Sequence, residues 1–229
     1  MLAPQAGWVN PCGGALWRTL DDGSVEVDGH GLWKHEPGSA GYKTLETTYL
    51  NWAREFHDVA RQYDVPVSWL VAIAANETGY LASRPDYQRT VSRTEPSGVT
   101  SVGIMQPLTV TAAALGFDPS QLGDAFTNIS VGAAFMLNPK MAGKNLAYGF
   151  PAVAATYNAG HICNTGNDIF NTAGHKGAYV TNAIKFLNTA IINMDVDGYS
   201  STGAARMGMG LGLGIVGLGV AVAVYLNRG

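Results

Sequence analysis

The sequence predicts a mostly α-helical domain with an irregular N-terminal arm before it and an apolar C-terminal helix after it. Apolar residues recur at three- and four-residue steps in several segments between residues 46 and 194, which is typical of helix faces. No strand-rich region interrupts these segments, and the final stretch 207–226 is free of charge. A length of 229 residues suits one main domain of roughly 150 residues plus extensions.

The composition excludes several classes of protein. Charged residues make up 14% of the chain, hydrophobic residues 47% and aromatic residues 10%, so a core can form and a disordered polyampholyte is excluded. The net charge of −3 argues against a basic nucleic-acid footprint, and no nucleic-acid specificity is expected. Cys12 and Cys163 are too few for a disulfide scaffold or an iron–sulfur cluster, and whether they pair stays open.

The predicted domain boundaries follow the changes of pattern. Residues 1–45 are rich in Gly, Pro and Trp and form the irregular arm, with one hairpin suggested by the alternation over 24–28. The arm starts without the basic and apolar runs of a conventional secretion signal. Residues 46–194 form the helical domain, and 195–206 form a polar linker.

Within the domain, each helix has its own signal. From Thr47, apolar residues follow one helix face up to Tyr63, and Pro66 suits the first turn of an apolar, buried helix that ends near Gly79. Residues 81–100 are rich in Pro, Ser, Arg and Thr and are predicted as a surface loop. Further helices are expected at 108–116, 125–138, 151–159 and 177–193.

The apolar segment 207–226 is predicted to be a transmembrane helix. As a helix, its twenty residues would be about 30 Å long, which is the thickness of a bilayer's hydrocarbon core. Arg206 and Arg228 flank it symmetrically, so charge leaves its orientation open. The alternative is a Gly-rich tail that packs on a partner protein.

Three short segments contain candidate chemistry. Glu77 stands at the end of an apolar helix, where burial and the negative helix end both favour a protonated carboxyl that can donate a proton. Gln106 ends the turn Gly103-Ile104-Met105-Gln106 and offers an amide to sugar hydroxyls. In Thr156-Tyr157-Asn158-Ala159-Gly160, Tyr157 offers a ring face and a hydroxyl, and Asn158 and Gly160 suit a helix end.

In this order, the segments resemble the lytic transglycosylase family with a soluble-lytic-transglycosylase-like catalytic domain. That family has Glu-Ser-Gly, Gly-Leu-Met-Gln and Ala-Tyr-Asn-Ala-Gly elements, and here Thr78 replaces the Ser. The pairs Asn128-Ile129 and Tyr179-Val180 also resemble pairs of the family, and the resemblance covers about residues 47–193.

The resemblance implies a lysozyme-like fold and cleavage of peptidoglycan, with no cofactor and no metal. Glu77 would protonate the β-1,4 glycosidic oxygen between N-acetylmuramic acid and N-acetylglucosamine, and the 6-hydroxyl would attack to give a 1,6-anhydro product. The implied substrate-binding residues are Thr78, Met105, Gln106, Tyr157 and Asn158.

Two alternatives accompany this prediction. The insertion 81–100 carries Asp86 and Glu95, either of which is a candidate second carboxylate that would position water for inverting hydrolysis, as in goose-type lysozymes. The other alternative is a structural virion or membrane protein that retains the fold without turnover. In the favoured hypothesis the chain is a phage virion protein that opens the wall during genome ejection. It would lie in the virion or the cell envelope, bound to a membrane through 207–226 and to other virion or envelope proteins.

Overall fold

The computed structural model describes residues 7–78, 92–94, 99–163 and 176–198. The chain divides into two units, Met1–Tyr199 and Ser200–Gly229, and all described residues belong to the first. Its elements are β1 (Trp17–Thr19), β2 (Val25–Val27), α1 (Ala40–Tyr63), α2 (Val67–Thr78), β3 (Ser92–Thr94), β4 (Thr100–Val102), α4 (Thr109–Ala114), the 3-10 helix η2 (Pro119–Gln121), α5 (Ala125–Leu137), the 3-10 helix η3 (Ala142–Tyr148), α6 (Phe150–Ala159) and α7 (Lys176–Ile192).

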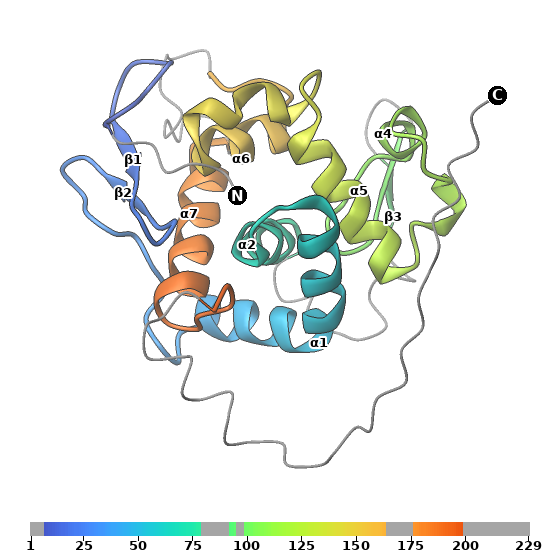
Figure 1. The fold of residues 1–229 in the computed structure, drawn as a ribbon, viewed down its shortest axis with the longest axis horizontal. Coiled ribbons are helices and arrows are strands. Elements are labelled where there is room, and N and C mark those ends of the chain that lie inside the picture. The colour runs from blue at the N-terminus through green and yellow to red at the C-terminus, as the bar shows by residue number, and fades with distance from the viewer. Residues whose placement is uncertain (1–6, 79–91, 95–98, 164–175, 199–229) are drawn as a thin grey trace, which may run out of the picture. The chain divides into compact units, whose positions relative to one another are not determined.

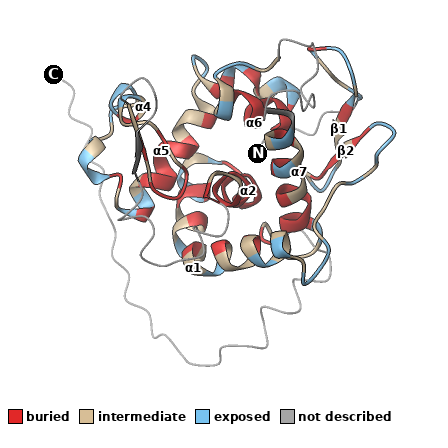
Figure 2. Ribbon diagram, turned by 180° about the vertical axis from the view of Figure 1, so that it is seen from behind, coloured by how far each residue is buried: buried red, intermediate tan, exposed pale blue. Residues whose placement is uncertain are grey.

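Helix α2 is the centre of the fold. Helices α1, α5, α6 and α7 surround it (Figure 1), and ten of its twelve residues are buried (Figure 2). Trp69 of α2 meets Phe150 of α6 edge to face, with 5.3 Å between the ring centroids. The prediction of an apolar helix buried on most sides is confirmed, and α2 ends at Thr78, beside the expected stop.

Helix α1 begins earlier than its apolar pattern indicates. It starts at Ala40 rather than near Thr47, because the Ser39 side chain accepts a hydrogen bond from the Tyr42 backbone N–H at 3.2 Å and caps the first turn. Leu45, in the added stretch, is fully buried. The start was missed because one buried residue in the first turns is too little to define a face.

The predicted hairpin in the arm is confirmed. Strands β1 and β2 pair antiparallel, with Trp17 opposite Val27. Trp17, Val25 and Val27 are fully buried and belong to the same core as the helices. The Trp17 indole N–H donates to the Tyr148 carbonyl at 2.8 Å, so the hairpin is joined to the residue that precedes α6 by two positions.

Asn188 of α7 bonds to the arm at a second place, through the backbone of Val25 and Trp33. Its Oδ1 accepts from the Val25 N–H at 2.7 Å, and its Nδ2 donates to the carbonyls of Val25 and Trp33, both at 2.8 Å. Asn188 is fully buried, and the arm supplies all three bonds. The arm therefore packs as part of the helical unit.

The helical region contains one short strand pair that the sequence did not predict. Strands β3 and β4 form an antiparallel pair, with Arg93 opposite Ser101, and β3 lies inside the expected loop 81–100. Three-residue strands are too short to show alternation, and their pairing is a tertiary contact. The other predicted helices are confirmed to within about two residues, and η2 and η3 were not predicted.

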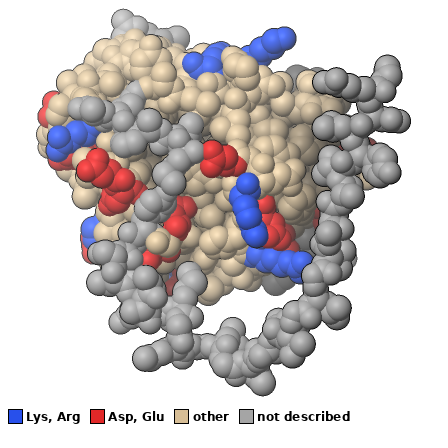
Figure 3. Space-filling model, in the orientation of Figure 1, with Lys and Arg blue, Asp and Glu red and all other residues tan. Residues whose placement is uncertain are grey.

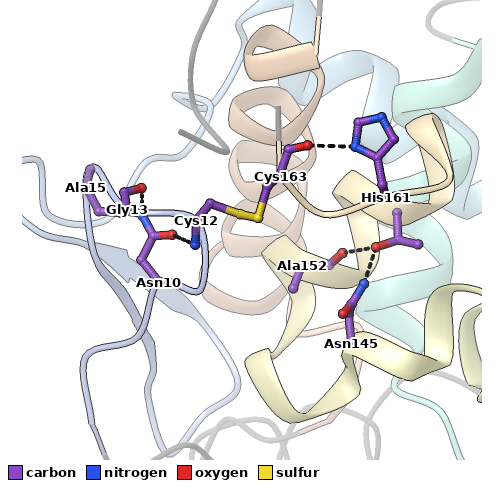
Figure 4. The surroundings of a disulfide bond; sticks show 9 residues. Asn10, Cys12, Gly13, Ala15, Asn145, Ala152, His161 and Cys163 are labelled. Carbon is purple, nitrogen blue, oxygen red and sulfur yellow. Dashed lines mark hydrogen bonds between the residues drawn. A yellow bond between two sulfur atoms is a disulfide. The ribbon is translucent and has the colours of Figure 1, made fainter. Parts of the chain in front are cut away.

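Cys12 and Cys163 form a disulfide, which answers the question that the sequence left open. The bond joins the arm to the segment after α6 (Figure 4). On the arm side, Asn10 Oδ1 accepts from the Cys12 N–H at 2.7 Å. On the other side, His161 Nδ1 donates to the Cys163 carbonyl at 2.7 Å. Both ends of the bridge are therefore held by local hydrogen bonds.

The surface and the tail complete the description. On the face drawn in Figure 3, the described acidic and basic side chains are interspersed over a larger uncharged area. Among the described residues, no helix is both long and apolar enough to cross a bilayer. The predicted transmembrane segment 207–226 lies outside the described residues.

Candidate active site

Glu77 lies one residue before the end of α2, where it faces α7. The Tyr179 hydroxyl of α7 donates a hydrogen bond to Glu77 Oε1 at 2.5 Å. Asn76, the preceding residue, donates from Nδ2 to the Tyr179 backbone carbonyl at 3.0 Å. Glu77 is half-buried, so the carboxyl is partly withdrawn from water and has a fixed hydroxyl partner.

Tyr157 of α6 lies within electrostatic reach of Glu77. Its hydroxyl donates to the Met105 backbone carbonyl at 2.7 Å, and its ring meets Phe135 edge to face. The structure thereby brings together Glu77, Met105 and Tyr157, one residue from each of the three segments that the sequence singled out. Tyr179 was noted in the sequence only as part of a family-like pair, with no role assigned.

The charge of Glu77 acts on both tyrosines. Burial, and then the Glu77 charge, raise the pKa of Tyr157 well above its usual value near 10. Burial raises the pKa of Tyr179 in the same way, and the Glu77 charge and hydrogen bond raise it further. Both phenols therefore stay protonated at neutral pH and remain hydrogen-bond donors beside the carboxyl.

The segment after β4 is a tight turn built on two left-handed residues. Gly103 has φ +75° and Gln106 has φ +49°. Gln106 is folded onto the turn, because its Nε2 donates to the Gly103 carbonyl at 2.6 Å and its Oε1 accepts from the Ser101 hydroxyl at 2.9 Å. The amide that was predicted to bind sugar hydroxyls thus bonds within its own turn, and its contact with a sugar stays a prediction.

The other predicted binding residues differ in exposure. Met105 is fully buried, and its carbonyl is the group that contacts Tyr157. Thr78 is buried and its hydroxyl donates to the Ala74 carbonyl at 2.8 Å, within the same helix. Asn158 is exposed, next to Tyr157. Their contacts with substrate stay predictions, and Asp86 and Glu95 lie outside the described residues.

This arrangement suits proton transfer. A half-buried carboxyl beside two protonated phenols can give a proton to a leaving oxygen and take one back. Among the described residues, no cluster of three His, Cys, Asp or Glu side chains could hold a metal ion. The described groups point to acid–base chemistry with one carboxyl as its centre.

Comparison with known proteins agrees with this geometry. The family model described as the transglycosylase SLT domain matches residues 55–179, which is more than half of the chain. No curated protein and no solved structure matches the chain significantly. The matched range contains Glu77, the turn at 103–106, Tyr157 and Tyr179. The chain therefore belongs to the transglycosylase SLT domain family and is a lytic transglycosylase that acts on peptidoglycan.

Proposed function

We propose that Glu77 is the acid–base catalyst that cleaves the β-1,4 bond between N-acetylmuramic acid and N-acetylglucosamine. Its proton passes to the glycosidic oxygen as the bond from that oxygen to C1 of the muramic acid breaks. The 6-hydroxyl oxygen of the muramic acid then bonds to C1, and the Glu77 carboxylate takes the proton that this hydroxyl loses. The step consumes no water, and it leaves a 1,6-anhydro end and a free N-acetylglucosamine end.

The observation that supports this proposal is the contact between Glu77 and Tyr179. A hydroxyl at 2.5 Å fixes the orientation of the carboxyl and stabilises the carboxylate that is left after the first proton transfer. Tyr157 adds a second protonated phenol within electrostatic reach of Glu77. One carboxyl, used first as acid and then as base, is enough when the nucleophile belongs to the sugar.

Mass spectrometry of the released muropeptides tests the reaction. We expect anhydro ends, lighter by one water than reducing ends, from the unmodified protein. Glu77→Gln should lower the rate by at least about a hundredfold, because the amide neither donates nor accepts the reacting proton. Glu36→Gln is the control, since the side chain of Glu36 is 77% exposed.

Two results would count against the proposal. Reducing ends would indicate hydrolysis of the goose-type kind, with Asp86 or Glu95 as the second carboxylate. Equal activity of the Glu77→Gln and Glu36→Gln variants would show that another group is the acid.

We also propose that the protein opens the cell wall locally during phage genome ejection, as a virion or cell-envelope protein. A wall-cleaving domain followed by the apolar segment 207–226 combines the two activities that such a step needs. The disulfide supports a location outside the reducing cytoplasm. Peptidoglycan also lies outside the cytoplasm. Flotation with phospholipid vesicles should carry the full chain but leave residues 1–206 behind, and equal flotation of both would refute a membrane role for the tail.

A further inference from the structure

Asn128 of α5 lies beneath the turn that contains Met105. Its side chain is fully buried and makes three hydrogen bonds. Oδ1 accepts from the Met105 N–H at 2.9 Å, and Nδ2 donates to the carbonyls of Val102 and Leu122, both at 2.9 Å. Two of the three bonds thus hold the turn on either side of Gly103.

The glycines show how closely the turn fits α5. A Cβ atom at Gly103 would lie 2.2 Å from Asn128 Nδ2, and one at Gly132 would lie 2.5 Å from Met105 Cε. Asn128 and Gly132 are four residues apart and therefore share a face of α5. That face therefore packs closely on the turn at two places: the polar Asn128 lies against Gly103, and Gly132 lies against the apolar Met105 side chain.

The turn connects this face to the active site. Met105 accepts at its carbonyl from the Tyr157 hydroxyl at 2.7 Å, while its N–H donates to Asn128. The peptide groups on both sides of Met105 are therefore held by side chains of two different helices, α5 and α6. A displacement of Met105 on α5 would move the carbonyl that holds the Tyr157 hydroxyl, a group within electrostatic reach of Glu77.

We propose that Asn128, together with Gly132, is a positioning residue for the transglycosylase reaction. Neither residue touches the reacting atoms. They set the position of the Met105 carbonyl, which in turn accepts from the Tyr157 hydroxyl and orients it. The inference rests on the role proposed above for Glu77 and assigns a function to Asn128, which the sequence marked only as part of a family-like pair.

The test compares Asn128→Asp with Asn188→Asp in the full chain. Asn188 is an equally buried Asn that also makes three hydrogen bonds, but to the N-terminal arm. Each change keeps the acceptor oxygen and replaces the donor to two carbonyls by a second oxygen. We expect both variants to lose thermal stability, and only Asn128→Asp to lower kcat, by about tenfold with KM changed less than twofold.

A double-mutant cycle with Tyr157→Phe identifies the route. If Asn128 acts through the Tyr157 hydroxyl, Asn128→Asp should lower kcat by less than about threefold once that hydroxyl is absent. Gly132→Ala is the milder second variant, in case Asn128→Asp does not fold. It should lower kcat by about threefold, and Tyr157→Phe should again reduce the effect.

Two outcomes would overturn the inference. One is a loss of kcat in Asn188→Asp as large as that in Asn128→Asp, which would mean that general softening is the cause. The other is the same loss of kcat with and without the Tyr157 hydroxyl. Glu77→Gln is assayed in parallel: if it stays active, the proposed catalyst is wrong, whereas an inactive Glu77→Gln with additive effects in the cycle refutes the positioning role alone.

Discussion

At the scale of single residues, Gly103 and Gly116 show two different reasons why a position needs glycine: a left-handed backbone, and a lack of space for a Cβ atom. Both have positive φ, +75° and +83°, but a Cβ at Gly103 would meet Asn128 at 2.2 Å, whereas a Cβ at Gly116 meets nothing within 4 Å. Gly116→Ala should cost about 1 kcal/mol of unfolding free energy from backbone strain. Gly103→Ala should cost about 3 kcal/mol or more, because the clash also displaces a buried hydrogen-bonded amide.

Urea unfolding of the two variants measures this difference. Only Gly103→Ala should also lose activity, since its turn holds Met105 under Tyr157. Equal costs for the two variants would mean that Asn128 moves aside easily and that the turn is held less firmly than its hydrogen bonds indicate.

Tyr157 and Tyr179 predict how stability depends on alkaline pH. Burial and the Glu77 charge raise the pKa of both phenols in the folded protein, while the unfolded chain releases these protons near pH 10. Above pH 10, the folded state therefore binds more protons than the unfolded state does. The stabilisation is complete below pH 10 and is lost as pH rises toward the folded pKa values.

Thermal unfolding from pH 9 to 11 checks this prediction. The Tm of the unmodified protein should fall with pH more steeply than that of the Tyr157→Phe, Tyr179→Phe double variant. Identical slopes for the two proteins would contradict the direction of the two pKa shifts.

At the scale of elements, the disulfide connects the arm to the end of the helix that carries Tyr157. Cys12 and Cys163 are separated by 151 residues, so the bond closes a long loop and restricts the unfolded chain strongly. Cys163 follows Gly160, the left-handed cap of α6, by three residues. The bond therefore stabilises the domain and also holds the backbone just beyond Tyr157 and Asn158.

Replacing both cysteines by serine should lower the unfolding free energy by about 2–5 kcal/mol. Activity near the lowered Tm should fall with it. A reducing agent should have the same effect on the unmodified protein and none on the double variant. A variant as stable as the unmodified protein would show that the arm stays in place through its packing and hydrogen bonds alone.

At the scale of the whole molecule, the arm is part of the hydrophobic core. Trp17 is fully buried, whereas Trp8, on the neighbouring stretch of the same arm, is 39% exposed. Arg18 lies over the Trp8 ring at 4.8 Å, a contact that is open to solvent. The two tryptophans therefore separate the effect of removing a buried arm residue from the effect of removing an exposed one.

Trp17→Ala should cost about 3–5 kcal/mol, because it empties a large site in the core and removes the bond to Tyr148. Trp8→Ala should cost less than about 1 kcal/mol. Urea unfolding of both variants measures the ratio. Similar small costs would show that the arm can detach while the helices stay folded.

The sequence alone determined the helices and the catalytic candidate. The helices were predictable because their signals lie in neighbouring residues: the spacing of apolar residues, a proline at 66 and the apolar run of α2. Helix α2 carries Glu77 at its end as expected. The three motif segments could also be found, because residue type and spacing are visible without coordinates. The strands β3 and β4 and the early start of α1 were missed, since pairing and capping leave little trace in short segments.

The tertiary structure alone decided which groups act on Glu77. Tyr179 is 102 residues away along the chain, Asn128 and Met105 are 23 apart, and the two cysteines are 151 apart. Amides and phenols at such separations have many equally suitable partners in the sequence, and for the two cysteines the sequence left open whether they pair at all. Only the packing of α5, α6 and α7 around α2 selects one partner for each, because hydrogen bonds and disulfides form over a few ångströms and are set by the folded backbone.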